Sequence, residues 1–504
     1  MTDALSPGST AMVVRYAGGT QAGQLPMHAS IVRDPYDTNR GRVIDADVIE
    51  QVLDTALRRG GDFAEVFVED RRSSSARLDD ERIEELTSGR DRGAGIRVVV
   101  GESTGFAHTA DLSAEGLRAA ADAASLAARA SGDATRRVAL ATRHDVRAHA
   151  IDVLPESVPK ADKIELLRRA EAEARSAGAA IRSVSASFAD SRRRILVANS
   201  DGLHVTDDQV RTRCMVQCVA SGDTGLQTAM EAPGRSVGFE FYDEFAVEAV
   251  ARTAAQRALT LLDAVPAPSG QMAVVLKRGA GGVLFHEACG HGLEADLVQR
   301  DASVFAGRVG TQVASPLVTV IDDGTYAREW GTFAIDDEGQ PAQRNVLIEN
   351  GVLTDYMWDL VRARKADRAS SGNGRRETYR HLPMVRMTNT FLPAGATDPD
   401  DIIRDTEYGL YCVQLGGGQV DTATGDFVFG VTEGYLIEHG EITRPVRAAQ
   451  LVGNGPQTMQ LVDAVGNDFD TWTGTCGKSG QGVPVSSGQP TLRVARMTVG
   501  GTAA

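Results

Sequence analysis

The chain has 504 residues, 42% of them hydrophobic and 24% charged, which is ordinary for a soluble globular protein of two or three domains. Its formal net charge of −15 argues against nucleic acid as a partner, because proteins that bind nucleic acids present basic surfaces. No run of about 18 apolar residues occurs, which argues against a membrane-spanning helix. Five cysteines and an N-terminus without a signal-peptide pattern predict reduced thiols and a cytoplasmic location.

The N-terminal half begins with a segment rich in Gly, Ser, Thr and Pro, which predicts a mobile tail over residues 1–40. Residues 41–265 then predict a mixed α/β domain with an antiparallel sheet. Helical spacing of apolar residues occurs over 45–59, 113–130, 160–177 and 245–262. Strand-like segments occur over 64–69, 77–86, 95–100, 104–109, 182–190, 192–199 and 203–220.

A linker is predicted over residues 266–270, where two prolines, a serine and a glycine follow each other closely. The remainder, 271–504, predicts a mainly β domain that carries a metal-binding helix near its start. Apolar runs over 271–277, 317–321, 346–348, 411–415, 427–431, 434–438 and 492–499 are the predicted strands. Tight turns are predicted at 322–324, 350–351 and 439–440. The predicted fold class is therefore α+β, in two domains.

Two of the nine histidines, His286 and His291, lie within six residues, and Glu287 directly follows the first. Neutral imidazoles bind zinc, and an adjacent carboxylate can take a proton from water on the metal. The common zinc motif spaces its histidines four residues apart. A spacing of five on a regular helix would point the rings about 140° apart. A metal site therefore requires a π-bulge or a break before His291, near Gly290. The alternative is a buried helix with two incidental histidines.

The third metal ligand has several candidates, among them Cys289, Cys412, Cys476, His381 and acidic residues. Cys476 is the best placed, because it lies in a glycine-rich segment predicted to be a flexible loop, where Lys478, or the metal itself, would lower the pKa of the thiol. The alternative for Cys476 is a small buried residue in a turn. Cys289 and Cys412 are expected to pack in the core.

Residues 285–296 resemble the H-E-x-x-x-H motif of the TldD/PmbA family, on the TldD side. The resemblance extends in the same order over 319–325, 334–339, 345–351, 372–377, 416–421 and 476–481. It covers roughly residues 45 to 500 and implies a zinc (Zn²⁺) metallopeptidase whose ligands are His286, His291 and Cys476. It also implies proteolysis of flexible peptides in a chamber formed with a paralogous subunit that lacks the metal motif. Because this chain keeps the motif, it resembles the catalytic subunit.

Further roles are expected for residues around this motif. Glu287 would act as the general base and then pass the proton to the leaving amine, although a surface salt bridge is the alternative. Tyr379 and His381 are candidate donors to the oxyanion. Arg376 is a candidate for binding a substrate carboxylate, although an arginine pair such as Arg375 and Arg376 is more often solvated. The glycines at 416–418 are expected to line the cleft rather than to cradle a phosphate.

Two functional hypotheses follow from the sequence. The first is a zinc-dependent peptidase that holds small or unfolded peptides as an added strand and works as a heterodimer with a TldE/PmbA-like subunit, or as a homodimer. The second is a non-catalytic peptide-binding regulator, of the kind that modulates DNA gyrase or toxin–antitoxin systems, with a structural metal. An open fourth coordination position favours the enzyme, and a fourth protein ligand favours the regulator.

Overall fold

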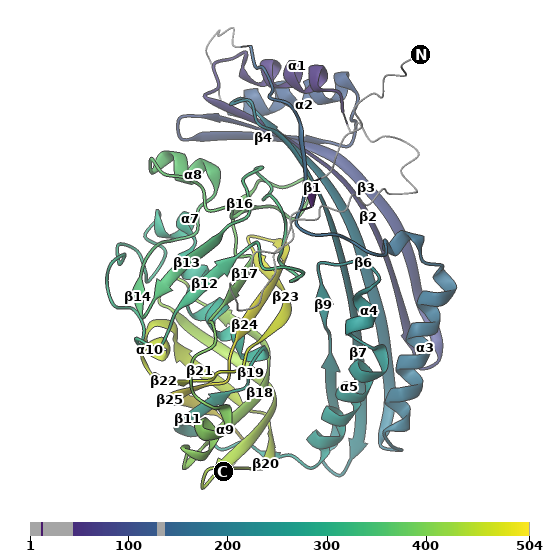
Figure 1. Ribbon diagram of the computed structural model, residues 1–504, viewed down its shortest axis with the longest axis vertical. Coiled ribbons are helices and arrows are strands. Elements are labelled where there is room, and N and C mark those ends of the chain that lie inside the picture. Colours follow the sequence, from purple (N-terminus) through teal and green to yellow (C-terminus); the bar gives the residue numbers. More distant parts are fainter. Residues whose placement is uncertain (1–11, 14–43, 129–136, 503–504) are drawn as a thin grey trace, which may run out of the picture.

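The computed structural model describes residues 12–13, 44–128 and 137–502, so the predicted tail over 1–40 lies almost wholly outside the described residues. The described chain is mixed α/β and rich in strands. Figure 1 shows a long curved sheet built from the N-terminal half beside a strand-rich part built from the C-terminal half. Within the described ranges, no helix combines the length and the apolar character needed to cross a membrane.

The N-terminal half forms a nine-stranded sheet, in the order β1-β5-β7-β6-β2-β3-β4, with β8 and β9 paired to β7. The strands are β1 Met12–Val13, β2 Phe63–Asp79, β3 Arg82–Val100, β4 Ser103–Thr109, β5 His144–Arg147, β6 Ile181–Asn199, β7 His204–Gly222, β8 Gly225–Glu231 and β9 Gly234–Arg235. Several predicted short strands are therefore parts of longer ones: 182–190 and 192–199 are a single strand, and 77–86 spans the turn between β2 and β3.

Helices cover one face of this sheet and leave the other face to the C-terminal half. They are α1 Ala46–Leu57, α2 Ala114–Ala127, α3 Lys160–Ser176, α4 Phe241–Glu244 and α5 Val247–Leu262, with a 3-10 turn at Pro155–Ser157. α1 and α2 bury their apolar sides over one end of the strands, and α3 and α5 over the other. Ser113 caps α2, since its side chain accepts a hydrogen bond from the Gly116 N–H.

The C-terminal half contains an eight-stranded sheet, ordered β10-β20-β19-β18-β11-β25-β21 with β22 on β25, and a six-stranded sheet, ordered β14-β13-β12-β17-β24-β23. The strands of the first sheet are β10 Val265–Pro266, β11 Gly270–Leu276, β18 Tyr408–Val420, β19 Asp426–Glu438, β20 Glu441–Arg447, β21 Gln450–Asn454, β22 Val462–Val465 and β25 Leu492–Gly500. Those of the second are β12 Val320–Asp323, β13 Arg344–Glu349, β14 Val352–Leu353, β17 Asn389–Phe391, β23 Asp470–Lys478 and β24 Gln481–Gln489.

Short elements complete this half, and its largest apolar cluster is shared by both sheets and the helical segment that follows β11. A two-stranded ribbon pairs β15 Gly374–Arg375 with β16 Met384–Val385. The helices are α6 Val283–Phe285, α7 Ala295–Val298, α8 Leu360–Lys365, α9 Pro399–Arg404 and α10 Gly455–Gln460.

Two of the three predicted tight turns are confirmed. Asn350 and Gly351 join β13 to β14 with φ of 49° and 83°, and His439 and Gly440 join β19 to β20 with φ of 56° and 77°. The turn predicted at 322–324 is wrong, because β12 continues to Asp323 and a long loop then leads to β13. Asp322 is fully buried there and accepts hydrogen bonds from Asn373, Thr388 and Thr390.

Buried ion pairs join the two halves. Arg97 on β3 contacts Glu65 of β2 and Glu338 of the C-terminal half, each at 2.7 Å. Arg376 contacts the other oxygen of Glu65 at 2.5 Å. All four side chains are almost completely buried. Because an unpaired charge in such surroundings is costly, the two halves are held in one relative position.

Replacement of Arg97 by Met should lower the free energy of unfolding by about 3–5 kcal/mol, because it leaves Glu65 and Glu338 buried with one partner fewer. Arg90→Met is the matched control on the same strand, since the Arg90 side chain is 48% exposed and pairs with Asp70 at the surface. It should cost less than about 1 kcal/mol. Chemical unfolding followed by circular dichroism measures both. Equal losses would show that the Arg97 contacts do not hold the halves together.

Candidate metal centre

The histidine segment is an irregular helix directly after β11. A 3-10 turn at Ala280–Gly282 leads into α6, a π-turn over His286–Gly290 and a further 3-10 turn at His291–Leu293. The His291 N–H donates to the His286 carbonyl, five residues back, which is the hydrogen bond of a π-turn. The predicted irregularity before His291 is confirmed.

The π-turn packs tightly at Gly290. A Cβ at this position would lie 2.2 Å from the Sδ of Met387, so only glycine allows the turn to approach its neighbour this closely. The turn places both rings on one side, with centroids 5.1 Å apart and planes at 87°.

The two imidazoles and one thiol converge on a common point. The Nε2 atoms of His286 and His291 lie 3.3 and 3.4 Å from the Cys476 Sγ, and the three ligand atoms all lie within 4.8 Å of one another. Tetrahedral zinc, with bonds of about 2.0–2.3 Å, spaces its ligand atoms roughly 3.3–3.8 Å apart. The spacing and the chemistry of these donors fit zinc. The group of three also leaves a fourth position for water or substrate.

Cys476 lies on β23, where it pairs with Val483 of β24. The prediction of a flexible loop here is wrong, because Ser479 and Gly480 alone make the turn and the residues before them are a regular strand. The buried guanidinium of Arg386 donates to the Cys476 carbonyl at 2.5 Å and to the Gln481 carbonyl at 3.2 Å. The thiol is therefore held on a rigid hairpin.

The electrostatics of the group favour a thiolate beside the imidazoles. Burial opposes the charged thiolate, yet His286 and His291 lower the pKa of Cys476 well below its usual value. Burial likewise opposes a charged imidazole, but Glu294 and Cys476 raise the pKa of His291 well above its usual value. A thiolate is the form that binds a metal.

A cluster of charged side chains lies behind the His291 imidazole. Its Nδ1 is 3.1 Å from the Glu294 Oε2, and Lys478 donates to Glu294 at 2.8 Å and to Asp296 at 2.7 Å. Burial raises the pKa of Glu294, but His291 and Lys478 outweigh it and lower the value to about 2. An ionised Glu294 fixes Nδ1 as the donor and leaves Nε2 free for a metal. Lys478 thus neutralises these carboxylates, whereas the histidines lower the pKa of the thiol.

The sequence did not lead us to predict this cluster of charged side chains. The signal was present, because Glu294 follows His291 by three residues within the segment that carries the family resemblance. What the sequence did not reveal is that the strand with Cys476 returns Lys478 to the same place.

Glu287 faces the open side of the group. Its carboxylate lies 4.0 Å from the His291 Nε2, and in the described part of the chain no lysine or arginine pairs with it. Burial raises its pKa, although both histidines act in the opposite direction. The carboxylate is therefore not in a surface salt bridge, and a raised pKa suits a group that accepts a proton near neutral pH.

A cleft of about 940 Å³ opens over the metal group and Glu287. Residues 228–230 of β8, the glycines at 416–418 and residues 474–479 on and after β23 are among those that line it. The expectation that the glycines line the cleft is confirmed. The cleft thus lies between the N-terminal and C-terminal halves.

Three other predicted site residues are not brought to this cleft. Tyr379 is buried, with its N–H donating to Glu69 at 2.8 Å. Arg376 is buried against Glu65, and the His381 Nδ1 lies 2.9 Å from the Thr378 Oγ1. None of the three lines the cleft, and their substrate-binding role stays a prediction. The expectation of a solvated pair at Arg375 and Arg376 is wrong, because both are buried.

Comparison with known proteins identifies the family. Three domain models of PmbA/TldA metallopeptidases match the chain: domain 1 over residues 64–128, the central domain over 154–262 and the C-terminal domain over 269–501. The chain is 39% identical to the Metalloprotease TldD homolog of Haemophilus influenzae, covering 91% of this chain and 97% of the relative. It is 36% identical to a Metalloprotease of Methanothermobacter thermautotrophicus, covering 91% and 100%. The chain belongs to the PmbA/TldD family and is a metallopeptidase.

Solved structures share the fold. A putative modulator of a DNA gyrase from Thermotoga maritima matches with a TM-score of 0.75 at 20% identity, covering 90% of this chain and 99% of that one. TldE from Thermococcus kodakarensis matches with a TM-score of 0.71 at 19% identity, covering 90% and 99%.

Replacement of Glu294 by Gln should weaken zinc binding about 10–100-fold, because the amide no longer fixes His291 with a charged acceptor. Asp296→Asn is the control, since Asp296 contacts Lys478 without touching His291. Competition with a chromogenic zinc chelator measures both affinities. An affinity for Glu294→Gln equal to that of the control would show that the carboxylate does not position the imidazole.

Proposed function

We propose that the chain is a zinc-dependent peptidase that hydrolyses small or unfolded peptides, with His286, His291 and Cys476 as metal ligands and Glu287 as the general base. The observation that carries this proposal is the convergence of two imidazoles and a thiol at 3.3–3.4 Å beside a carboxylate that no lysine or arginine of the described chain pairs with. A structural metal would be expected to have a fourth protein ligand, and the group has three.

When bound, zinc supplies a Lewis acid that polarises the scissile carbonyl and acidifies water. Glu287 takes the proton of the attacking water and passes it to the nitrogen of the leaving amine, so that the peptide bond breaks without release of an amide anion. Glu294 keeps the Nδ1 proton of His291 in place throughout, and Lys478 balances the charge of Glu294.

The cleft suits an extended peptide. β23, which carries Cys476, is the last strand in the order of its sheet, and β8 pairs only with β7 among the described strands. Both strands line the cleft, so each offers a free edge to which a peptide backbone can add. β18 is irregular at Gly416 and Gly417, because its pairing with β19 passes from Leu415 directly to Gly418. Recognition through the main chain selects unfolded segments, because a folded chain has already paired its backbone groups.

We further propose that the chain works with a paralogous TldE-like subunit, with a homodimer as the alternative. The shared fold with a TldE supports a partner of the same architecture. Size-exclusion chromatography with light scattering, on the chain alone and with its related subunit, distinguishes a heterodimer from a homodimer.

The metal and the base can be separated by two variants. Wild-type protein should hold zinc near one equivalent, and Cys476→Ala should lose most of it, because one of three ligands is removed. Glu287→Gln should keep the zinc but cleave an unstructured peptide about 10²–10⁴-fold more slowly. Metal analysis and peptide cleavage, each with and without the related subunit, measure these changes. Full activity of Glu287→Gln would remove the carboxylate from the mechanism.

A side chain at Gly417 should obstruct the peptide without disturbing the fold. A Cβ there meets no atom within 4 Å and the backbone is not left-handed, so Gly417→Val fits the free enzyme. We expect kcat/KM for an unstructured peptide to fall about tenfold or more, while zinc content and melting temperature stay at their wild-type values. Gly89→Val is the control, because a Cβ at Gly89 on β3 also meets open space. Equal activity of the two variants would place the peptide elsewhere.

A further inference from the structure

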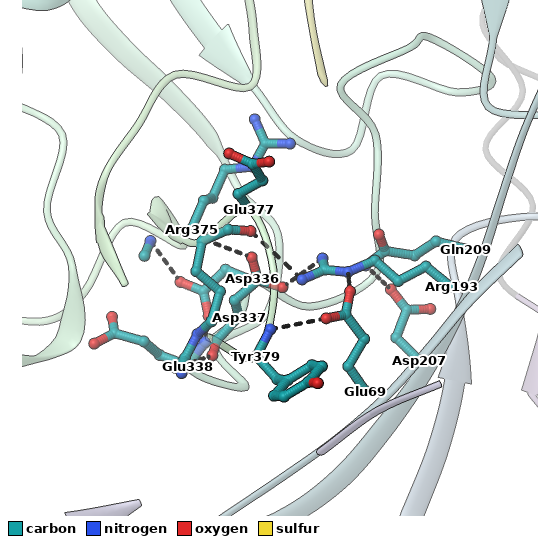
Figure 2. A network of polar contacts seen from close by, with 12 residues as sticks. Glu69, Arg193, Asp207, Gln209, Asp336, Asp337, Glu338, Arg375, Glu377 and Tyr379 are labelled. Carbon is teal, nitrogen blue, oxygen red and sulfur yellow. Dashed lines mark hydrogen bonds and ion pairs between the residues drawn. The ribbon is translucent and has the colours of Figure 1, made fainter. Parts of the chain in front are cut away.

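A second cavity, of about 440 Å³, lies between the N-terminal sheet and the C-terminal half. Its sheet wall is formed by β2, β6 and β7, and its other wall by Trp330, Phe333, the arginines at 375–376 and residues 482–484 of β24. Figure 2 shows Arg193, from the sheet, reaching Asp337 on the facing loop; Arg375 and Glu377 belong to the same facing side. The proposed peptidase chemistry uses none of these side chains.

The sheet wall consists of small side chains bordered by arginines. In one cross-strand row Arg71, Arg193 and Gln209 lie side by side, and in the next row Ser73, Ser191 and Arg211 do so. A third row places Ser75, Ala189 and Arg213 together. The serines and the alanine leave space in the middle of this face. The hydroxyls of Ser73 and Ser191 offer donors there, whereas the Ser75 hydroxyl donates to Glu85.

The facing wall adds another guanidinium. Arg375 donates to the carbonyls of Met387 and Pro484, at 2.6 and 2.7 Å, and its guanidinium carbon lies 5.2 Å from the centroid of the Phe333 ring. Arg213 lies over the ring of Trp330 in the same way. These contacts hold the arginines in place but do not neutralise them.

The carboxylates that line the cavity do not neutralise the charge of all its arginines. Arg193 pairs with Glu69 and Asp337, and Arg376 pairs with Glu65. In the described part of the chain, no carboxylate lies within ion-pair distance of four arginines, namely Arg71, Arg211, Arg213 and Arg375.

Four carboxylates line the cavity, and three of them are already engaged. Asp190 pairs with Lys163, and Asp337 pairs with Arg193. Burial and the nearby Glu338 raise the pKa of Asp336 well above its usual value, which favours its neutral form. Glu377, which accepts a hydrogen bond from the Gly482 N–H, is the remaining one.

Burial and neighbouring arginines lower the pKa values of two of these guanidinium groups. Burial, and then the nearby Arg375 and Arg193, lower the pKa of Arg211 to about 9. Burial also lowers the pKa of Arg375 to about 10; Asp337 acts in the opposite direction and Arg386 in the same one. Buried like charges that no carboxylate pairs with directly destabilise a fold, so a bound anion would relieve them.

We propose that this cavity binds a small oxyanion with two negative charges, held by Arg71, Arg211, Arg213 and Arg375 and by the serine hydroxyls between them. Guanidinium groups bind the paired oxygens of carboxylate and phosphate through two parallel hydrogen bonds. The ligand is therefore of the phosphate or dicarboxylate class.

The ligand is a free anion rather than part of the peptide substrate. The β23–β24 hairpin stands between the cavity and the metal cleft, with Cys476 facing the metal and Val483 and Pro484 lining the cavity. Thr475 borders both spaces. The site is thus separate from the metal, and its occupancy does not depend on peptide hydrolysis.

The test uses the full chain with sulfate, which stands for the phosphate class, and succinate, which stands for the dicarboxylate class. Titration calorimetry at millimolar anion, with sodium chloride at matched ionic strength as the reference, gives each dissociation constant. We expect saturable binding of at least one dianion in the wild type. Arg71→Gln and Arg213→Gln should each weaken it about tenfold or more, because a charge-assisted hydrogen bond is lost.

Arg72→Gln and Cys476→Ala are the controls. Arg72 is exposed on the opposite face of β2, and Cys476→Ala removes a metal ligand from the other cleft. Both should bind the dianion as the wild type does. In chloride alone, Arg213→Gln should melt no lower than the wild type, since it removes a half-buried charge that no carboxylate of the described chain pairs with, and the dianion should raise its melting temperature less.

Three results would overturn the proposal: no dianion binding beyond that of chloride, equal weakening by Arg72→Gln, or loss of binding in Cys476→Ala. The last would place the anion at the metal. Tighter binding of sulfate than of succinate would assign the site to the phosphate class, and the reverse would assign it to dicarboxylates.

Discussion

The proposed metal centre depends on a π-turn, in which the backbone hydrogen bond reaches five residues back instead of the four of an α-helix. A regular helix would direct His286 and His291 to different sides, whereas the π-turn aligns them toward one strand. The turn is possible because Gly290 lets the sulfur of Met387 fill the space that a side chain would need. The Cys476 thiol on β23 and the Glu287 carboxylate both lie next to the two aligned imidazoles.

Much of this could be read from the sequence. The five-residue spacing of the histidines requires an irregular helix, and the structure has one. The helices α1, α2, α3 and α5 follow directly from the spacing of their apolar residues. The proposed ligands and the proposed general base came from the family resemblance and from the chemistry of zinc.

What failed has physical reasons. The long strands were divided too often, because arginines and serines in their middle interrupt the apolar pattern; those residues face a polar cavity between the two halves. Arg376 and Tyr379 suggested a substrate surface, but only tertiary contacts reveal that Glu65 and Glu69 bury them. The same holds for Asp322, whose turn-like neighbours concealed a buried acceptor. Local sequence does not encode which charged side chains, hundreds of residues apart along the chain, contact each other in the fold.

The connectivity of the metal centre sets an order of events during synthesis. His286 and Cys476 are 190 residues apart, and β11, directly before the histidines, pairs with β25 at the end of the described chain. A ribosome adds about 5–20 residues per second, so the ligand set stays incomplete for roughly 10–40 s after His286 is made. The nascent chain therefore passes through most of its synthesis, when its own backbone is least protected, without the full set of proposed metal ligands.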